Sequence, residues 1–364
     1  MTPTFKNRDM IYNAVLILII LFLRSDVLSK RNDTIRSNVE NRNSNLAWLL
    51  IVIMAALRKP IDGTDVWGYM LQYNDMFNTS ILDALNNERT NDYIGYFFTS
   101  KLFSLTGLSY HWWFGFIEAL YVLALKSFVD KFSKDKLFSI LVFVTCGLFS
   151  FSLAGLKQAM SMALMLFSFV RFIDKKYINS VLFFIYAYLC HPVSIVFLVA
   201  FPLYYLRNNT RFVFYIASGT ILLYVFGLTI MKNLVSLMEM EHFEMYLSED
   251  RSYSYVTFIF YIVIVALSCL KYGKYKAFDS NEARMVLGFS LLTCGLQLLA
   301  GFSPTMFRLA YFYSPFLMIL LPNATNYAQK EEKTLVRTAL IISIVFFYLY
   351  TMRNTSYPYS FFWQ

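Results

Sequence analysis

Four places in the sequence put charged or hydrogen-bonding side chains beside long apolar runs. In the first, RKPIDGTDVWGYMLQYNDMF, Arg58 ends an apolar run and two carboxylates, Asp62 and Asp65, follow within turn-forming residues. Tyr69 and Tyr73 are four residues apart, so they share one face if the segment is helical. A cation beside paired carboxylates and aromatic rings could hold a phosphorylated sugar. The structural alternative is an arginine that reaches the membrane interface, followed by an ordinary acidic turn.

The second and third places lie at the ends of apolar helices. Lys157 and Gln158 open one such helix, where the positive end of the helix dipole would help them bind pyrophosphate. His191 stands directly before Pro192, which breaks a helix. An imidazole with an ordinary pKa of about 6.5 suits general acid–base catalysis. The alternatives are a lysine that extends to the interface and a histidine that caps a broken helix.

The fourth place is PTMFRLAYFYSP, near the C-terminal end. Here Arg308 is followed one helical turn later by Tyr311. The planar guanidinium matches phosphate geometry, and a tyrosine can stack on a sugar; the alternative is a plain interfacial arginine. A further carboxylate, Glu118, lies within an apolar run, and we expect it to form a structural ion pair with Lys101 or Lys157.

The sequence contains no signature of a nucleotide or metal site. There is no GxxxxGK[ST] loop and no dinucleotide-binding glycine pattern, which argues against an ATP-driven pump. None of the four cysteines has a metal-ligand spacing such as C-x-x-C, and the chain has three histidines in all. We therefore expect no metal, no cofactor and no nucleic-acid partner.

The composition indicates what must position these residues. Of 364 residues, 58% are hydrophobic, 19% are aromatic and only 15% are charged, whereas soluble proteins carry about 25% charged residues. This excludes a water-soluble enzyme and a disordered chain. The net charge of +9 comes from lysines and arginines spread through short loops, where they set the topology of a membrane protein.

The pattern of apolar runs predicts an all-α polytopic membrane protein. Thirteen apolar runs are candidates for membrane-spanning helices, and basic segments separate many of them. All of these basic segments can lie in the cytoplasm, as is typical of membrane proteins, if the run 93–108 does not cross the membrane. That run is short and contains Lys101, so we predict a re-entrant or juxtamembrane helix on the outer face. The remainder gives about 12 crossings with both termini outside. We expect a single transmembrane domain over 1–364, with outer-face loops 58–111 and 232–254.

At the four places the chain resembles the EpsG-like, Wzy-type polysaccharide polymerases of bacterial O-antigen and capsule assembly. The resemblance covers roughly residues 46–320. It departs from the family pattern at Val66 in place of an aromatic residue, at Asp92 in place of Glu, and at Lys157 in place of Arg. The matching positions are Arg58, Gly63, Thr64, Asp65, Tyr69, Tyr73, Gln158, His191, Ser194, Phe307, Arg308 and Tyr311.

The resemblance implies a metal-independent glycosyltransferase that joins oligosaccharide repeats linked to undecaprenyl pyrophosphate. The reaction would take place at the outer face of the bacterial inner membrane, among membrane lipids, and a chain-length regulator is a candidate protein partner. Three cations would hold the pyrophosphate: Arg58, Lys157 and Arg308. One of three groups would be the base: Asp62, Asp65 or His191. Further side chains would orient the substrate: Gln158, Tyr69, Tyr73 and Tyr311.

Two other functions fit part of the sequence. A flippase for the same lipid-linked repeats would share the helix count and the intramembrane cations, but paired repeat halves are not evident. A membrane O-acyltransferase acting on the same glycan would be expected to have an early intramembrane Arg and His pair, and the first apolar runs contain no histidine.

Overall fold

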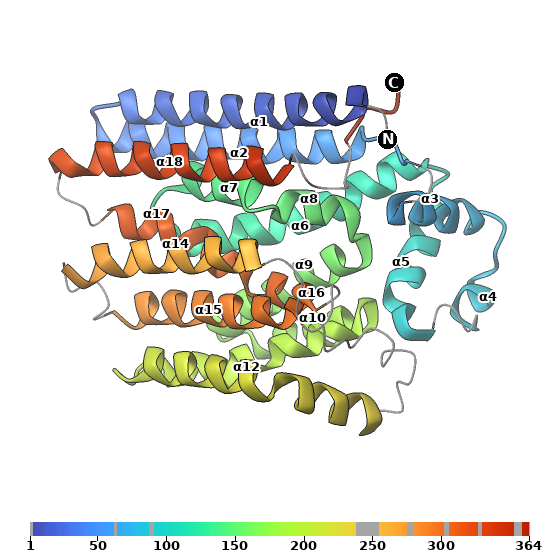
Figure 1. Ribbon diagram of the computed structural model, residues 1–364. Helices are drawn as coiled ribbons and strands as arrows, with labels where there is room; N and C mark the ends of the chain where they lie inside the picture. Colours follow the sequence, from blue (N-terminus) through green and yellow to red (C-terminus); the bar gives the residue numbers. More distant parts are fainter. Residues whose placement is uncertain are drawn as a thin grey trace. The chain divides into compact units, whose positions relative to one another are not determined.

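The computed structural model describes residues 3–61, 64–86, 91–237, 255–274, 280–301, 306–326, 330–352 and 359–363. Every extended regular element in these ranges is a helix, and an isolated antiparallel bridge joins Arg58 to Phe361. The all-helical class predicted from the sequence is therefore confirmed (Figure 1).

The chain divides into two compact units, Met1–Ile195 with Leu335–Gln364, and Val196–Thr334. The single-domain organisation expected from the sequence stays a prediction. The helices of the first unit are α1 (Pro3–Ser29), α2 (Asp33–Ala56), α3 (Asp65–Asp75), α4 (Ile81–Asn86), α5 (Ile94–Ser104), α6 (Tyr110–Phe132), α7 (Lys136–Thr145), α8 (Leu148–Ala154), α9 (Leu156–Ile173) and α10 (Tyr177–Cys190), with a 3-10 turn η1 (Asn91–Tyr93) before α5.

The first unit is built on an antiparallel hairpin of α1 and α2, visible in Figure 1. The hairpin turns at Asn32, whose side chain accepts hydrogen bonds from the Thr34 and Ile35 amides and so caps α2. Helix α2 packs on α6, α6 on α9, α9 on α10, and α10 on α5. Large aromatic side chains such as Trp113 and Phe114 are fully buried between these helices.

A sharp break separates α7 from α8, whose axes differ in direction by 58°. Gly147 lies at the break with φ +79, a left-handed conformation that glycine adopts without steric cost. Helix α8 ends at Ala154, and α9 begins at Leu156, directly after Gly155. The break and the short connection bring the last carbonyls of α8 next to the first turn of α9.

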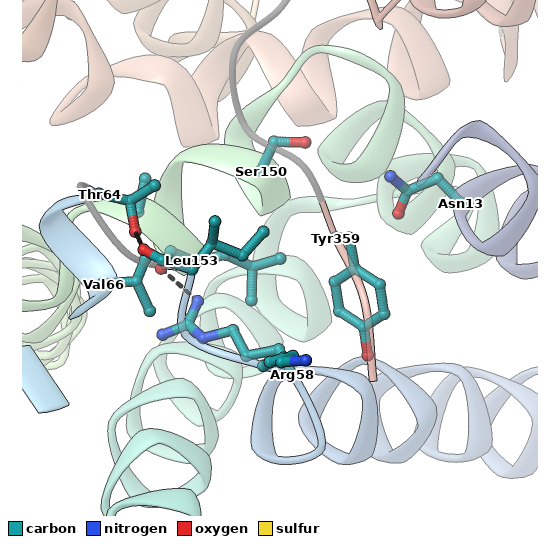
Figure 2. A pocket seen from close by; sticks show the side chains of 10 residues that line it. Asn13, Arg58, Thr64, Val66, Ser150, Leu153 and Tyr359 are labelled. Atoms are coloured by element: carbon teal, nitrogen blue, oxygen red, sulfur yellow. Dashed lines mark hydrogen bonds between the residues drawn. The ribbon is translucent and has the colours of Figure 1, made fainter. Parts of the chain in front are cut away.

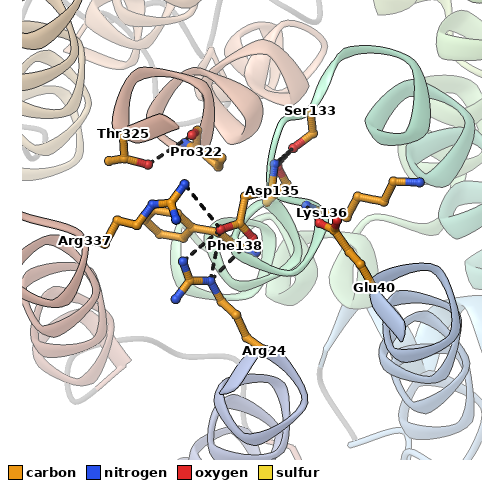
Figure 3. A network of polar contacts seen from close by, with 10 residues as sticks. Arg24, Glu40, Ser133, Asp135, Lys136, Phe138, Pro322, Thr325 and Arg337 are labelled. Atoms are coloured by element: carbon orange, nitrogen blue, oxygen red, sulfur yellow. Dashed lines mark hydrogen bonds and ion pairs between the residues drawn. The ribbon is translucent and has the colours of Figure 1, made fainter. Parts of the chain in front are cut away.

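An ion network lies at the end of the α1–α2 hairpin that carries the turn (Figure 3). The Arg24 guanidinium donates to one Asp135 oxygen through Nη2 at 2.8 Å and through Nε at 3.2 Å. Arg337 Nη2 lies 3.9 Å from the same carboxylate oxygen, and the Lys136 amide donates to Glu40. Arg58 follows the other end of α2, so the hairpin separates this network from Arg58.

The second unit packs around α15. Its helices are α11 (Ala200–Leu206), α12 (Phe212–Leu237), α14 (Tyr255–Lys274), α15 (Asn281–Leu298), α16 (Phe307–Tyr311) and α17 (Ser314–Asn326); η2 (Pro192–Val199) enters this unit, η4 (Leu299–Gly301) follows α15, and α18 (Lys330–Met352) leaves it. Helix α15 contacts α12, α14, α16 and α17. A side chain at Gly295 would meet Thr220 at 2.5 Å, so glycine permits the close approach of α15 to α12.

Four described helices are long and apolar enough to cross a membrane: Tyr12–Ser29, Tyr110–Phe132, Leu156–Ile173 and Asn281–Gly301. The bent pair α7 and α8 would make a fifth. The chain is thus a membrane protein, but the prediction of about 12 crossings is not confirmed, since several apolar runs form helices of 10–17 residues in the described ranges. Helix α5, expected not to cross, has 11 residues and spans about 17 Å against a hydrocarbon core of about 30 Å.

Candidate functional site

Arg58 follows the last turn of α2 and is held there by backbone pairing with the C-terminal segment. The Lys59 amide donates to the Ser360 carbonyl at 2.7 Å, and the Phe362 amide donates to the Leu57 carbonyl at 2.9 Å. The Arg58 side chain is buried, its guanidinium lies 4.7 Å from the centre of the Phe114 ring, and Nη1 donates to the Leu153 carbonyl. That carbonyl belongs to the C-terminal turn of α8, whose partial negative charge favours a cation.

A cavity of about 50 Å³ opens beside this guanidinium (Figure 2). Within the described part of the chain, Arg58 Nε has no hydrogen-bond partner. Burial lowers the pKa of Arg58 to about 10, and the Glu118 charge opposes that shift, so the guanidinium stays charged at neutral pH. The cavity is lined by Asn13, Arg58, Lys59, Ile61, Thr64, Val66, Ser150, Leu153, Ala154 and Tyr359.

Glu118 has a different environment from the one expected. Its Oε1 accepts a hydrogen bond from the Ser152 hydroxyl at 3.2 Å, and its charge acts on Arg58. Lys101, one of the two expected partners, instead donates to the Met76 carbonyl at 2.8 Å. No ion pair of Glu118 with Lys157 is found in the described ranges. The prediction was wrong because α6 turns Glu118 toward the break between α8 and α9.

Lys157 lies inside a cage of aromatic rings. Its ammonium nitrogen is 4.4 Å from the centre of the Tyr93 ring and 4.6 Å from that of Phe97. The rings of Tyr96 and Tyr69 follow at 5.6 and 5.8 Å. Rings at these distances attract a cation through their negative faces. We call these four rings with Lys157 the lysine cage.

Two carboxylates act on this ammonium from outside the cage. These are Asp65 and Asp92, whose negative charges interact with the Lys157 ammonium. Asp65 is the exposed first residue of α3, and Thr64 caps that helix by accepting from the Trp67 amide. The other predicted carboxylate, Asp62, lies outside the described residues.

His191 contacts the cage through one of its rings. The centres of the His191 and Tyr93 rings are 5.3 Å apart, in an edge-to-face arrangement. His191 caps the C-terminus of α10 and is 7% exposed. Gln158, next to Lys157 in α9, is buried. The structure therefore brings the second and third sequence motifs together with part of the first.

Tyr69 and Tyr96 lie near both cations. Their ring centres are 6.1 Å apart, and both side chains interact electrostatically with Arg58. Since both rings also belong to the lysine cage, the Arg58 cavity and the cage are neighbouring parts of one site. This site comes from the ends of α2, α3, α5 and α9 in the first unit.

Tyr73 occupies a different position from Tyr69. Its side chain is fully buried, its hydroxyl donates to the Leu108 carbonyl at 2.7 Å, and its ring stacks on Trp113. These contacts favour a structural role for Tyr73. On the helix face predicted to carry both tyrosines, Tyr69 thus contributes to the site and Tyr73 to the core of the unit.

Arg308 and Tyr311 belong to α16 in the second unit. Both are partly exposed, and the Tyr311 ring lies 5.5 Å from the Phe307 ring in an edge-to-face contact. Their expected part in the site stays a prediction.

The sequence reasoning missed most of the aromatic rings around the two cations. Tyr93, Tyr96 and Phe97 stand at i, i+3 and i+4, a helical spacing that could have indicated one common face. Phe114 and Tyr359 carry no such signal, because they reach Arg58 from distant parts of the chain.

The site offers two buried or caged cations, aromatic rings, and nearby acid–base groups. Two cations suit two negative charges, as on a pyrophosphate, and aromatic rings suit the faces of sugars. In the ranges that the structure describes, no group of three or more His, Cys, Asp or Glu side chains is placed to hold a metal ion.

Comparison with known protein families gives a match to one family over most of the chain. The model of the EpsG family matches residues 44–362, which contain Arg58, the lysine cage and Tyr359. No curated protein and no solved structure matches the chain.

Proposed function

The chain belongs to the EpsG family, and from this premise we propose that it is a polysaccharide polymerase. Its substrates are oligosaccharide repeats linked to undecaprenyl pyrophosphate, which it joins into O-antigen or capsule. The observation that carries the proposal is the pair of cations, Arg58 and Lys157, linked by the rings of Tyr69 and Tyr96.

The proposed reaction transfers a growing chain from its lipid carrier to a new repeat. The bond between the sugar C1 and the pyrophosphate oxygen breaks, and C1 forms a bond with a hydroxyl oxygen of the acceptor. The electron pair leaves with the lipid pyrophosphate, and the hydroxyl proton passes to a base. Arg58 and Lys157 stabilise the charge on the leaving pyrophosphate, because preorganised cations in a low-dielectric site act strongly there.

Asp65 and His191 are the described candidates for the base, since each lies next to the lysine cage. Asp62 remains a candidate from the sequence. The tyrosine rings of the cage would orient the sugars. Arg308 and Tyr311 would also bind the substrate, as the resemblance implies.

We place this site at the outer face of the bacterial inner membrane. Support comes from the basic residues of the Arg24–Asp135 network, which lie at the other end of the α1–α2 hairpin. Membrane proteins keep such residues in the cytoplasm. The site would then meet repeats that have already been moved outward.

A gel of surface glycans tests this function in cells that lack the chain, with and without its restoration. The proposal predicts a product stopped at one repeat unit, which returns to a ladder on restoration. Loss of even the single repeat, with lipid-linked repeats trapped inside, would instead indicate a flippase. An intact ladder that lacks acyl groups would indicate an O-acyltransferase.

A further inference from the structure

Helix α1 places one polar side chain, Asn13, at the edge of the Arg58 cavity. Asn13 lies in the first turn of the apolar stretch Tyr12–Ser29. The match to the EpsG family begins only at residue 44. The family relationship therefore says nothing about this residue, and neither did the sequence motifs.

Asn13 is buried without satisfying its hydrogen-bonding capacity. It is 5% exposed, and its Oδ1 has no hydrogen-bond partner among the described residues. A buried polar atom without a partner is destabilising and calls for an explanation. In Figure 2 the carboxamide extends from α1 toward the side of the cavity where Ser150 and Tyr359 lie.

A second polar atom without a partner in the described ranges belongs to the same cavity. Arg58 Nε donates to no acceptor there, although the guanidinium is buried. One wall thus offers a charged donor, and another offers a carboxamide that both donates and accepts. This combination suits a ligand that has an anionic group beside a neutral hydrogen-bonding group.

The size of the cavity limits what can enter. About 50 Å³ is room for a few ordered water molecules, or for one small polar substituent of a larger ligand. A hydroxyl or an acetamido group can exchange hydrogen bonds with a carboxamide, whereas a phosphate prefers the cation.

We propose that Asn13 binds a hydroxyl or acetamido substituent of the sugar attached to the pyrophosphate at Arg58. This inference rests on the proposed function and deepens it, because it assigns to α1 a part in choosing the repeat unit. A site built to hydrogen-bond a substituent discriminates against an analogue that lacks it. Asn13 is thus a specificity-determining residue outside the matched region.

Lipid binding to the purified full-length chain tests the proposal. Three probes are compared: undecaprenyl pyrophosphate alone, the same lipid carrying glucose, and the same lipid carrying N-acetylglucosamine. Asn13→Ala should leave the affinity for the bare lipid unchanged, which also shows that the variant is folded. It should weaken binding of a sugar-bearing lipid about threefold to tenfold, the effect of losing one neutral hydrogen bond.

The two sugars identify the bound substituent. Weakening for both lipids would indicate a hydroxyl group, and weakening only for the N-acetylglucosamine lipid would indicate the acetamido group. Asn43→Ala is the matched control, since Asn43 is a buried asparagine of the same hairpin whose amide donates to the Leu23 carbonyl and to Asp26. It should change none of the three affinities.

Two results would overturn the assignment of Asn13: unchanged affinity for both sugar-bearing lipids, or an equal loss of affinity for the bare lipid. Failure of the proposed function would look different. In that case Arg58→Ala would bind bare undecaprenyl pyrophosphate as tightly as the unaltered chain, whatever Asn13→Ala does.

Discussion

At the scale of single residues, the site uses two cations in different surroundings. Arg58 is fixed by the Leu153 carbonyl and the Phe114 ring, whereas Lys157 is surrounded by four aromatic rings. Arginine presents a rigid fork to phosphate, and lysine presents a compact point charge. The Arg58 guanidinium is therefore suited to hold the pyrophosphate in one orientation. The Lys157 ammonium is suited to neutralise negative charge on the pyrophosphate without fixing its orientation.

The charge of Lys157 should matter more than its exact geometry. Lys157→Met keeps the length of the side chain but removes the positive charge, so polymerisation should fall about 100-fold, as for the loss of one transition-state contact. Lys157→Arg restores the residue usual in the family pattern and should retain most activity. Rates of repeat joining by the two purified variants measure the difference. Equal rates for both variants would remove the Lys157 charge from the mechanism.

At the scale of elements, the sequence predicted the parts of the site that lie within single segments. The end of α2 just before Arg58 and the helix break at His191 both follow from local signals. Contacts between distant segments could not be predicted in this way. Tyr359 and Asn13 line the Arg58 cavity because the C-terminal segment and α1 pack there, and a single sequence carries no signal for such packing.

The predicted number of membrane crossings stays unconfirmed for a related reason. Apolar character in the sequence does not tell a helix long enough to span from a shorter apolar helix, and Tyr177–Cys190, with 14 residues, is such a shorter helix. The break at Gly147 divides another run into α7 and α8.

The break between α7 and α8 should depend on Gly147. Gly147→Ala forces a side chain into a left-handed conformation and should lower the stability of the chain by about 1 kcal/mol. It should also reduce polymerisation, because α8 presents the Leu153 carbonyl to Arg58. Thermal unfolding in detergent and a joining assay measure the two effects.

Gly68→Ala is the matched control for this change. Gly68 lies in α3, its φ is not positive, and a side chain there would meet nothing within 4 Å. The substitution should be neutral or stabilise the chain by about 0.5 kcal/mol. A loss of stability for Gly68→Ala as large as that for Gly147→Ala would contradict the argument from backbone conformation.

At the scale of the whole molecule, the α1–α2 hairpin separates an ion network from the proposed site. Asp135 Oδ2 forms ion pairs with Arg24 Nη2 at 2.8 Å and with Arg337 Nη2 at 3.9 Å. These ion pairs join α1, the start of α7 and α18. This end of the hairpin also carries Arg36 and Lys134. The network explains both how the ends of three helices are joined and why this end should face the cytoplasm.

The network should contribute strongly to stability. Asp135→Asn leaves the buried Arg24 guanidinium beside a neutral amide and should cost about 3 kcal/mol. Asp174→Asn removes the carboxylate of a surface pair with Lys131 and should cost less than about 1 kcal/mol. Thermal unfolding of both variants in detergent compares the two losses. Equal losses would show that burial of the network does not matter.

The proposed orientation in the membrane predicts which residues a reagent can reach from outside the cell. A membrane-impermeant thiol reagent should label Ser109→Cys in intact cells, because this exposed residue is expected on the outer face. Ser37→Cys, exposed in the first half of α2, should be labelled only after the membrane is permeabilised. Cytoplasmic labelling of residue 109 would show that the 93–108 segment crosses the membrane.

Repeat joining by the purified full-length chain in detergent tests whether the chain is a polymerase. Without a membrane barrier, transport has no effect on the product, so only a polymerase changes it. The unaltered chain, supplied with undecaprenyl-pyrophosphate-linked repeats and no nucleotide, should produce a ladder, and Arg58→Ala should leave single repeats. Single repeats from the unaltered chain, or the same ladder from Arg58→Ala, would contradict a polymerase that works through Arg58.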